Sequence, residues 1–315
     1  MILSMESLHS IEFEETRPFD LLVIDECQAN LSSHTNTKTN GKNFSANTDT
    51  LHRLMQNTAK IVMCDAFLNR KTIQFLSDQE LPTKLLNYQM EMQPRDATVI
   101  CNKCLDTLYP LIESGLGEGK RSYVFVSSAS RCKIWANNLR TKYPDKKIID
   151  YTQGEGKNIL NVREEWGDAH CILTTSTITV GINFDIKDYF HNCYISISSR
   201  ACNTVVDIFQ SHYRVRHLID NQIFLHISDN AWNKPSTDEA VLTQNLKWFE
   251  TNQIEMYTMF EKAPDYLIKL LALNQLEINL SASLLTGSVY AFLEACNYTI
   301  HTRESLDDDI DLDVD

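Results

Sequence analysis

Short apolar runs of strand length alternate with helix-period segments along most of the first 230 residues. The runs lie at residues 19–24, 60–64, 123–127, 147–151, 170–175, 193–197 and 223–227. Helical patterns separate several of them, at residues 50–58, 71–78, 103–113, 131–142 and 204–216. Continuous apolar runs are typical of strands buried on both faces, and their alternation with helices predicts a mainly parallel sheet covered by helices. We therefore expect an α/β fold.

The alternation stops near residue 230, and the remaining pattern is helical up to about residue 297. Pro82 and Pro94 interrupt the pattern earlier, which favours a domain boundary between residues 81 and 97. The expected domains are a partial α/β domain at residues 1–90, a second one at 97–232, a helical extension at 233–302 and an acidic disordered tail at 303–315. Residues 29–47, rich in Asn, Ser and Thr, are expected to form an exposed loop.

The net charge of −13 comes from 29 basic and 42 acidic residues, and it is unevenly spread. More than half of it lies in seven acids from Glu304 onward, where no Lys or Arg occurs. Such a run is typical of a solvated tail. The rest of the chain is only mildly acidic, so its charge neither predicts nor excludes a nucleic-acid partner.

No run approaches the roughly 18 apolar residues of a membrane span, and the N-terminal residues lack the basic region of a signal peptide. Nine cysteines without an export signal predict free thiols in a reducing compartment, so an intracellular, non-secreted protein is expected. Cys101 and Cys104 form one CxxC pair. A zinc site needs a second pair or histidines at matching spacing, so we interpret these thiols as structural or incidental.

Acidic residues follow two of the predicted strands directly. Asp25 and Glu26 come after the first strand, and Asp65 comes after the second. Ligands of α/β sheets bind beyond the carboxyl ends of the strands. An aspartate there can hold Mg²⁺, and a neighbouring glutamate can orient or deprotonate a water molecule. The alternative is a group of solvated acids at strand ends, which is common.

Hydroxyl groups follow a third strand. Thr175 ends the run at residues 170–175, and Ser176 and Gly181 come after it. Hydroxyls just after a strand, with a glycine nearby, suit contacts to phosphate. The alternative is an ordinary turn, because most hydroxyl-rich loops are turns.

A basic segment ends the predicted helix at residues 204–216. Gln210 and Arg214 are four residues apart and are expected on one helix face, and Arg216 follows. An arginine facing a γ-phosphate neutralises the charge that develops during phosphoryl transfer. The alternative is a basic helix end that suits the helix dipole.

In this order, the four segments resemble motifs II, III, V and VI of superfamily 2 helicases. The resemblance is stronger to the origin-binding helicase family typified by the herpesvirus replication origin-binding protein. The similar stretches are MESLHSI, FDLLVIDE, KIVMCDAFL, YVFVSSASRCKIWANNL, NVREEWGDAHCILTTSTITVGINF and FQSHYRVR. They extend from Met5 to Arg216, about two thirds of the chain.

The resemblance implies a function as well as a fold. It implies RecA-like lobes, the first one incomplete, that clamp ATP and Mg²⁺ while nucleic acid crosses them. The implied activity is ATP-dependent DNA unwinding in DNA replication. Single-stranded or origin DNA and other replication proteins would be the partners, without a membrane, in the nucleus if the source is eukaryotic.

The resemblance also implies roles for individual residues. Asp25 would hold Mg²⁺, Glu26 would activate the attacking water, and Asp65 would couple the nucleotide site to the DNA strand. Two further groups would border the cleft from the second lobe. Thr175, Ser176 and Gly181 would lie at its border and contact DNA phosphates, and Gln210, Arg214 and Arg216 would face the γ-phosphate.

The last of these motifs departs from the common superfamily spacing, Gln-x-x-Gly-Arg-x-x-Arg. Tyr213 replaces the glycine, and His217 occupies the position of the final arginine. Arg216 instead follows Arg214 by two residues, which on a continuing helix would direct the two side chains nearly opposite ways. The pattern therefore leaves open which arginine contacts phosphate.

A helicase of this class needs a P-loop, Gly-x-x-x-x-Gly-Lys-Ser/Thr, and the sequence has none. The Gly-Lys pairs at Gly41, Gly119 and Gly156 are never followed by Ser or Thr. Two interpretations stay open: a truncated helicase with its P-loop encoded upstream, or a non-catalytic remnant that binds DNA or a partner. A partial first lobe is expected to expose apolar surface.

Two further functions find less support in the sequence. A metal-dependent nuclease that uses Asp25, Glu26 and Asp65 is an alternative, but no His or carboxylate cluster completes such a site. Sequence-specific origin recognition, which the family places C-terminal to its helicase lobes, has no visible counterpart in residues 230–315.

Overall fold

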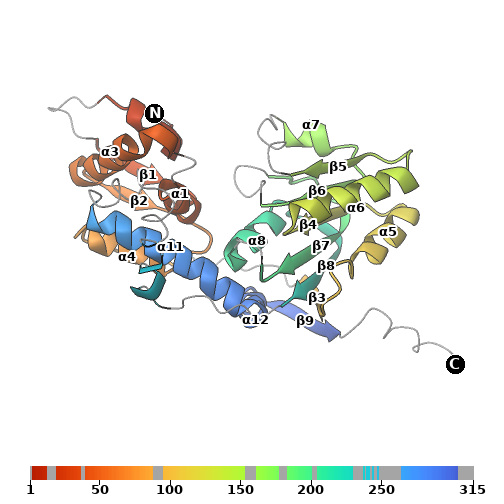
Figure 1. Cartoon of the computed structure of the whole chain (residues 1–315). Coiled ribbons are helices and arrows are strands. Elements are labelled where there is room, and N and C mark those ends of the chain that lie inside the picture. The colour runs from red at the N-terminus through yellow and green to blue at the C-terminus, as the bar shows by residue number, and fades with distance from the viewer. Residues whose placement is uncertain are drawn as a thin grey trace. The chain divides into compact units, whose positions relative to one another are not determined.

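The computed structural model describes residues 2–12, 19–36, 40–87, 95–152, 161–176, 183–200, 204–229, 237, 239–241, 243–244, 247 and 264–303. The chain divides into two compact units, whose elements are labelled in Figure 1. Unit 1 contains Met1–Tyr88 and Pro235–Asn279, and unit 2 contains Gln89–Lys234 and Leu280–Asp315. The residues expected to form a separate C-terminal extension are thus shared between the two units.

Unit 1 is built on two parallel strands, β1 (Leu22–Ile24) and β2 (Ile61–Met63), paired with Ile24 opposite Met63. Helices pack on one face of this sheet: η1 (Met5–Ser10), α1 (Cys27–His34), α3 (Phe44–Asn57), α4 (Arg70–Asp78) and the first part of α11 (Asp265–Ser283). In Figure 1 the blue α11 lies against α1 and α4. Buried apolar side chains from each helix form the core.

The other face of the β1–β2 sheet carries exposed apolar side chains. Val23 and Val62 pair across the two strands, and they are 54% and 47% exposed. Leu21, just before β1, is 53% exposed. Parallel sheets are normally covered on both faces. In the described residues, this face of the β1–β2 sheet therefore has no helix packed on it.

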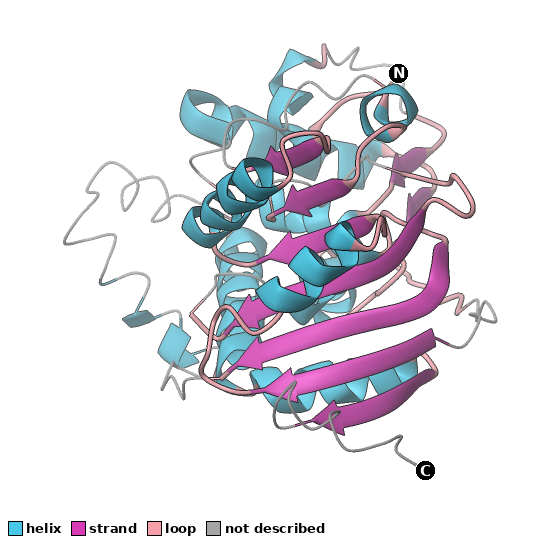
Figure 2. Ribbon diagram, turned by 90° about the vertical axis from the view of Figure 1, so that its right-hand side faces the viewer, coloured by secondary structure: helices cyan, strands magenta, loops and turns pink. Residues whose placement is uncertain are grey.

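Unit 2 contains a seven-stranded sheet in which every pair of neighbouring strands is parallel (Figure 2). The strand order is β5 (Ile148–Tyr151), β6 (Cys171–Thr174), β4 (Ser122–Val126), β7 (Phe190–Ser198), β8 (Leu218–Ser228), β3 (Arg95–Cys101) and β9 (Tyr298–Arg303). A parallel sheet with helices on both faces confirms the predicted α/β class and is the architecture expected of a RecA-like lobe.

Successive residues of β4 face two different cores. Tyr123 and Phe125 lie in the core formed with α7 (Val162–Trp166), α8 (Val205–His212) and α12 (Leu285–Ala295). Val124 and Val126 lie in the opposite core, formed with α5 (Tyr109–Gly117) and α6 (Ala129–Lys142). This alternation explains why the central strands are continuous apolar runs in the sequence.

The two units of the chain first divide between Tyr88 and Gln89, inside the segment expected to be a boundary, and strand β3 starts at the end of that segment. Three other sequence predictions differ from the structure. The expected helical extension ends in strand β9. The expected loop at residues 29–47 is largely helical, because α1, η2 (Gly41–Asn43) and the start of α3 occupy it. The helix expected to reach residue 216 ends at His212.

Within the described residues, no single helix is long and apolar enough to cross a membrane. Helices α11 and α12 meet that criterion only as a pair, and the chain bends by 97° between them.

Candidate functional site

Three of the predicted site residues lie together at the carboxyl ends of β1 and β2. Backbone hydrogen bonds continue the pairing beyond the strands: Cys64 N–H donates to the Ile24 carbonyl at 3.0 Å, and Cys27 N–H donates to the Cys64 carbonyl at 3.0 Å. These bonds bring the Asp25–Glu26 pair, after β1, beside Asp65, after β2. The edge of unit 1 where α/β sheets bind ligands is therefore acidic.

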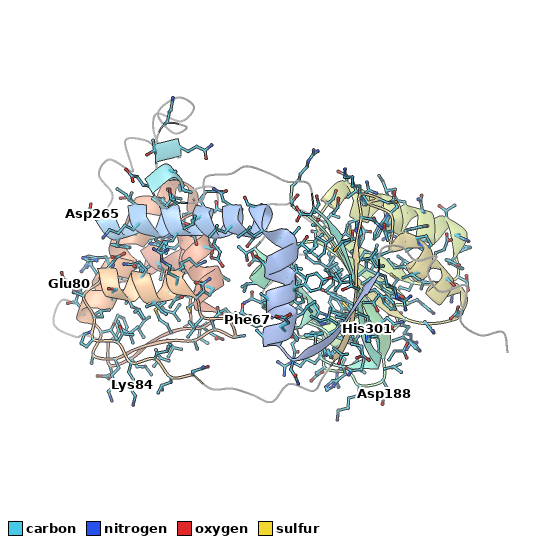
Figure 3. The ribbon with its side chains drawn as sticks, turned by 90° about the horizontal axis from the view of Figure 1, so that it is seen from below. Phe67, Glu80, Lys84, Asp188, Asp265 and His301 are labelled. Atoms are coloured by element: carbon cyan, nitrogen blue, oxygen red, sulfur yellow. The ribbon has the colours of Figure 1, made fainter. Side chains whose placement is uncertain are left out.

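Asp65 uses both carboxylate oxygens to fix the local backbone. Its Oδ2 accepts a hydrogen bond from the Gln28 N–H at 3.0 Å, and its Oδ1 accepts one from the Phe67 N–H at 2.9 Å. Phe67 is labelled in Figure 3. Because Gln28 lies in the first turn of α1, Asp65 ties the end of β2 to the start of that helix. Its carboxylate is thus a structural link between the two strand ends.

Asp25 is exposed and makes different contacts. Its Oδ1 accepts a hydrogen bond from the Glu26 N–H at 3.0 Å, and the Cys64 thiol donates to the same oxygen at 3.5 Å. Burial, and then this hydrogen bond to the Asp25 carboxylate, raise the pKa of Cys64. An exposed aspartate at a strand end offers the hard oxygen ligand that Mg²⁺ prefers, so Asp25 fits the ion.

Glu26 has a left-handed backbone, with φ 45° and ψ 50°, immediately before α1. A non-glycine residue in this conformation costs on the order of 1–2 kcal/mol, and such residues are concentrated at functional sites. The residues around Glu26 contain no glycine or other local signal that would predict this turn.

In unit 2, the arginine segment forms a turn at Tyr213 and Arg214 and a bridge at Val215, rather than the expected continuation of the helix. Helix α8 starts with a capping box between Thr204 and Asp207 and ends at His212. Beyond it, Phe184 N–H donates to the Arg214 carbonyl at 2.8 Å, and Arg216 N–H donates to the Phe184 carbonyl at 3.3 Å. The prediction that Gln210 and Arg214 share a helix face is therefore wrong, because the helix stops between them.

The three predicted phosphate-facing residues differ in exposure. Gln210 is buried in α8, Arg214 is half-buried and Arg216 is exposed. The charge of Arg214 acts on the buried hydroxyl of Tyr123, the second residue of β4. Among these three side chains, Arg216 is the most accessible to a ligand.

Arg95, which sequence reasoning did not single out, contacts this arginine segment. Its Nη2 donates to the Arg216 carbonyl at 2.6 Å, and its Nη1 lies 2.8 Å from His212 Nε2. Burial, and then the charge of Arg95, hold the pKa of His212 well below its ordinary value, so the ring is neutral. No local pattern points to Arg95, because its partners lie more than a hundred residues away in the sequence.

Thr175 and Ser176 lie at the opposite end of the parallel strands of unit 2, because they follow β6 whereas Arg214 and Arg216 precede β8. Thr175 is buried and its hydroxyl donates to the Tyr151 carbonyl at 3.3 Å, while Ser176 is exposed. The predicted site residue Gly181 lies outside the described residues.

A chain of hydrogen bonds connects β6 to α8 across β4. The Thr174 hydroxyl donates to the Tyr123 hydroxyl at 3.1 Å, which donates to the Ser211 carbonyl at 3.1 Å. Tyr123 is fully buried, and burial raises its pKa. The end of β6 and the end of α8 are thus joined through one side chain.

No group of three or more His, Cys, Asp or Glu residues in the described parts of the chain is placed to hold a metal ion. Cys101 and Cys104 are free and exposed. Burial, and then the charge of Asp229, raise the pKa of Cys101.

Comparison of the sequence with known families gives a match to the family described as origin of replication binding protein. The match covers residues 78–254, more than half of the chain. Curated relatives have the name replication origin-binding protein. That of human herpesvirus 7 (strain JI) is 28% identical over 84% of this chain and 32% of its own length. That of varicella-zoster virus (strain Dumas) is 22% identical over 80% of this chain and 33% of its own length. The chain thus spans about a third of the length of these relatives.

Solved structures that resemble this chain include two complexes with RNA and a nucleotide. S. cerevisiae Dbp5 bound to RNA and ADP BeF3 has a TM-score of 0.48 and 13% identity, covering 82% of this chain and 66% of Dbp5. Mss116p bound to ssRNA and AMP-PNP has a TM-score of 0.49 and 13% identity, covering 94% of this chain and 69% of Mss116p.

Proposed function

Since this chain belongs to the origin of replication binding protein family, we propose that it forms part of a DNA helicase in which ATP hydrolysis drives strand separation during DNA replication. The observation that supports this most strongly is the acidic edge of unit 1, where Asp25 and Glu26 meet Asp65. An aspartate at such a strand end holds Mg²⁺ in P-loop ATPases. The DNA partner, single-stranded or origin DNA, is part of this proposal, as are other replication proteins.

Each acid has a distinct role in the proposed reaction. The exposed Asp25 would hold Mg²⁺, which neutralises phosphate charge when bound. Glu26 would orient a water molecule and accept its proton. Asp65, whose oxygens are bonded to two backbone N–H groups, would keep the two strand ends in register.

Unit 2 would supply the basic and hydroxyl contacts. Arg216 would neutralise the developing phosphate charge, and Gln210 would support that segment from α8. Ser176, exposed after β6, would contact DNA phosphates, which hydroxyls bind readily. The 315 residues contain no P-loop sequence, so we propose that polypeptide outside them supplies the phosphate cradle.

ATP hydrolysis stimulated by single-stranded DNA tests this function. It is measured for the chain extended by the in-frame sequence upstream of Met1, and for the same protein with Glu26→Gln. We expect the variant to keep MgATP binding and to lose at least about 100-fold in hydrolysis, the size of a general-base contribution.

Glu80 provides a matched control, because it also has a left-handed backbone, with φ 56°, and is exposed away from the strand ends. It is labelled in Figure 3. Glu80→Gln is expected to hydrolyse ATP at the wild-type rate. Full activity in Glu26→Gln would show that the assigned role of Glu26 is wrong.

The missing P-loop favours a second function, a non-catalytic module that binds DNA or a replication protein. In this case the extended chain hydrolyses no ATP but binds single-stranded oligonucleotides in a salt-sensitive way. Fluorescence anisotropy at low and high salt measures such binding. Absence of binding at low salt contradicts the second function.

We also propose an intracellular location, in the nucleus if the source is eukaryotic. Work on replicating DNA requires it, and the cysteines in the described residues are free thiols, as is usual in reducing compartments.

A further inference from the structure

We propose that Arg95 is a positioning residue that holds residues 212–216 so that Arg216, rather than Arg214, presents its guanidinium to the phosphates of bound nucleotide. This inference rests on the proposed function and answers the question that the motif spacing left open. It concerns unit 2 alone.

The guanidinium of Arg95 contacts three positions of the segment. Nη2 donates to the Arg216 carbonyl at 2.6 Å, Nη1 donates to His212 Nε2 at 2.8 Å, and the group lies over the ring of Tyr213 at 5.6 Å. The rigid fork of arginine can make two directed hydrogen bonds and a stacking contact at once, which a lysine cannot. One side chain therefore fixes the segment where it leaves α8 and where it reaches Arg216.

The buried His212 is suited to receive this contact. An arginine can only donate, so Nε2 is the acceptor and Nδ1 carries the hydrogen. That hydrogen faces Cys193 Sγ, 3.1 Å from Nδ1. With a partner at each nitrogen, the ring has one orientation and gives Arg95 a fixed anchor.

Strand β9 completes the anchor from the C-terminal part of the chain. Tyr298 pairs with Arg95 in the β3–β9 register. Its hydroxyl lies 3.2 Å from His212 Nε2 and donates to the Tyr213 hydroxyl at 3.2 Å. Tyr213, which replaces the glycine of the common motif, thus contacts both Arg95 and Tyr298. The family match ends at residue 254, so this support lies beyond it.

The two arginines of the segment differ in what their side chains can reach. Both have bonded backbone groups, but the Arg214 side chain is half-buried near Tyr123, whereas that of Arg216 is exposed. A phosphate group needs an accessible guanidinium. Arg216 meets this requirement better than Arg214 does.

Hydrogen exchange tests the positioning role without any ligand. In Arg95→Lys we expect the amides of Val215 and Arg216 to exchange about tenfold faster than in wild type, the effect of losing one charge-assisted hydrogen bond. The matched control is Arg121→Lys, because Arg121 lies just before β4, stacks on Tyr189 at 4.3 Å and donates its N–H to a histidine outside the segment. Wild-type exchange in Arg95→Lys, or equal changes in both variants, would overturn the positioning role.

MgATP binding to the extended chain, measured by calorimetry, tests the choice of arginine. Arg216→Met and Arg214→Met keep most of the length of the side chain and remove its charge. We expect Arg216→Met to weaken binding about tenfold and Arg214→Met to weaken it less than about threefold. The reverse order would overturn the assignment to Arg216. If wild type does not bind MgATP, the proposed ATPase function and this assignment both fail, whereas the exchange experiment still decides the role of Arg95.

Discussion

Asp25 and Asp65 are equivalent in the sequence pattern, since each follows a short apolar run, but their hydrogen bonds differ. Asp65 accepts a backbone N–H on each oxygen, whereas Asp25 is exposed and accepts one on Oδ1. The position of an acid after a strand is visible in the sequence. The sequence does not show which of the two acids is held in place by hydrogen bonds, because this depends on the path of the turn that follows each strand.

This difference predicts unequal effects for one substitution at two sites. Asp65→Asn is expected to lower the free energy of unfolding of unit 1 by about 2 kcal/mol, because the amide cannot accept both N–H groups. Asp25→Asn is expected to change it by less than about 0.5 kcal/mol. Urea unfolding of the two variants measures both values. Equal losses would mean that Asp25 also has a structural role.

His34, in the last turn of α1, is a buried titratable group. Its side chain is buried, and neither ring nitrogen has a hydrogen-bond partner among the described residues. Burial lowers its pKa from 6.5 to about 4. The unfolded chain binds a proton at His34 more readily than the folded chain does. The contribution of His34 to the free energy of unfolding is therefore fully present above pH 6.5 and is lost as the pH falls towards 4.

The expected loss from His34 is about 2 kcal/mol between about pH 7.5 and pH 5. Urea unfolding at the two pH values measures it, and His34→Leu is the comparison, because leucine keeps the site apolar and cannot titrate. Between these two pH values, the free energy of unfolding of His34→Leu should fall by about 2 kcal/mol less than that of wild type. The other histidines titrate in both proteins, so their contribution cancels in this comparison. An identical pH dependence in both would contradict the burial of a neutral ring.

Each of the seven strands predicted from the sequence overlaps a strand of the structure, and β3 and β9 are the strands of the described residues that the pattern missed. β3 begins with Arg95 and Asp96 directly after Pro94, so its start is typical of a boundary. β9 alternates apolar and polar residues and follows a helical pattern; Figure 3 labels the exposed His301 on it. Central strands are visible as apolar runs, whereas an edge strand needs fewer buried positions.

Helix α1 was predicted as a loop because Asn and Ser normally compete with helical hydrogen bonds. In the structure, partners from distant elements satisfy these side chains. The Ser32 hydroxyl lies 3.2 Å from Asn274 Oδ1 and 2.7 Å from Lys71 Nζ, and Asn274 also donates to the Thr35 hydroxyl. Contacts with α4 and α11 thus override the local preference.

Two glycines at helices should respond in opposite ways to alanine. At Gly167, which follows α7, a Cβ atom would lie 2.5 Å from the Arg163 carbonyl oxygen, so the backbone must shift. At Gly287, inside α12, it would meet no atom within 4 Å apart from its chain neighbours and the backbone of its own helix. Thermal unfolding should show a loss of about 1–3 kcal/mol for Gly167→Ala and a gain of about 0.5–1 kcal/mol for Gly287→Ala. Two changes of the same sign would contradict this contrast.

For the molecule as a whole, the C-terminal residues contribute to two separate cores. Leu267 and Leu270 of α11 are buried in the core of unit 1, whereas Val289 and Leu293 of α12 are buried in a core of unit 2. The helical period of these residues was visible in the sequence. Their division between two cores was not, because a helical pattern shows which face is apolar and not which element covers it.

This division predicts that single truncations act on one unit at a time. Leu270→Ala and Leu293→Ala are each expected to cost about 2–4 kcal/mol through the cavity that remains. Hydrogen exchange resolved by residue should show the loss in unit 1 for the first variant and in unit 2 for the second. A loss spread evenly over both units in either variant would mean that the two cores unfold together.

The position of β3 between β8 and β9 has a consequence for synthesis on the ribosome. Thr98 of β3 pairs with Phe224 on one side and with His301 on the other. At roughly 5–20 residues per second, the last of these neighbours emerges on the order of 10–40 s after β3 itself. For that time an apolar strand has an open edge, so the nascent chain should be a substrate for chaperones until β9 is made.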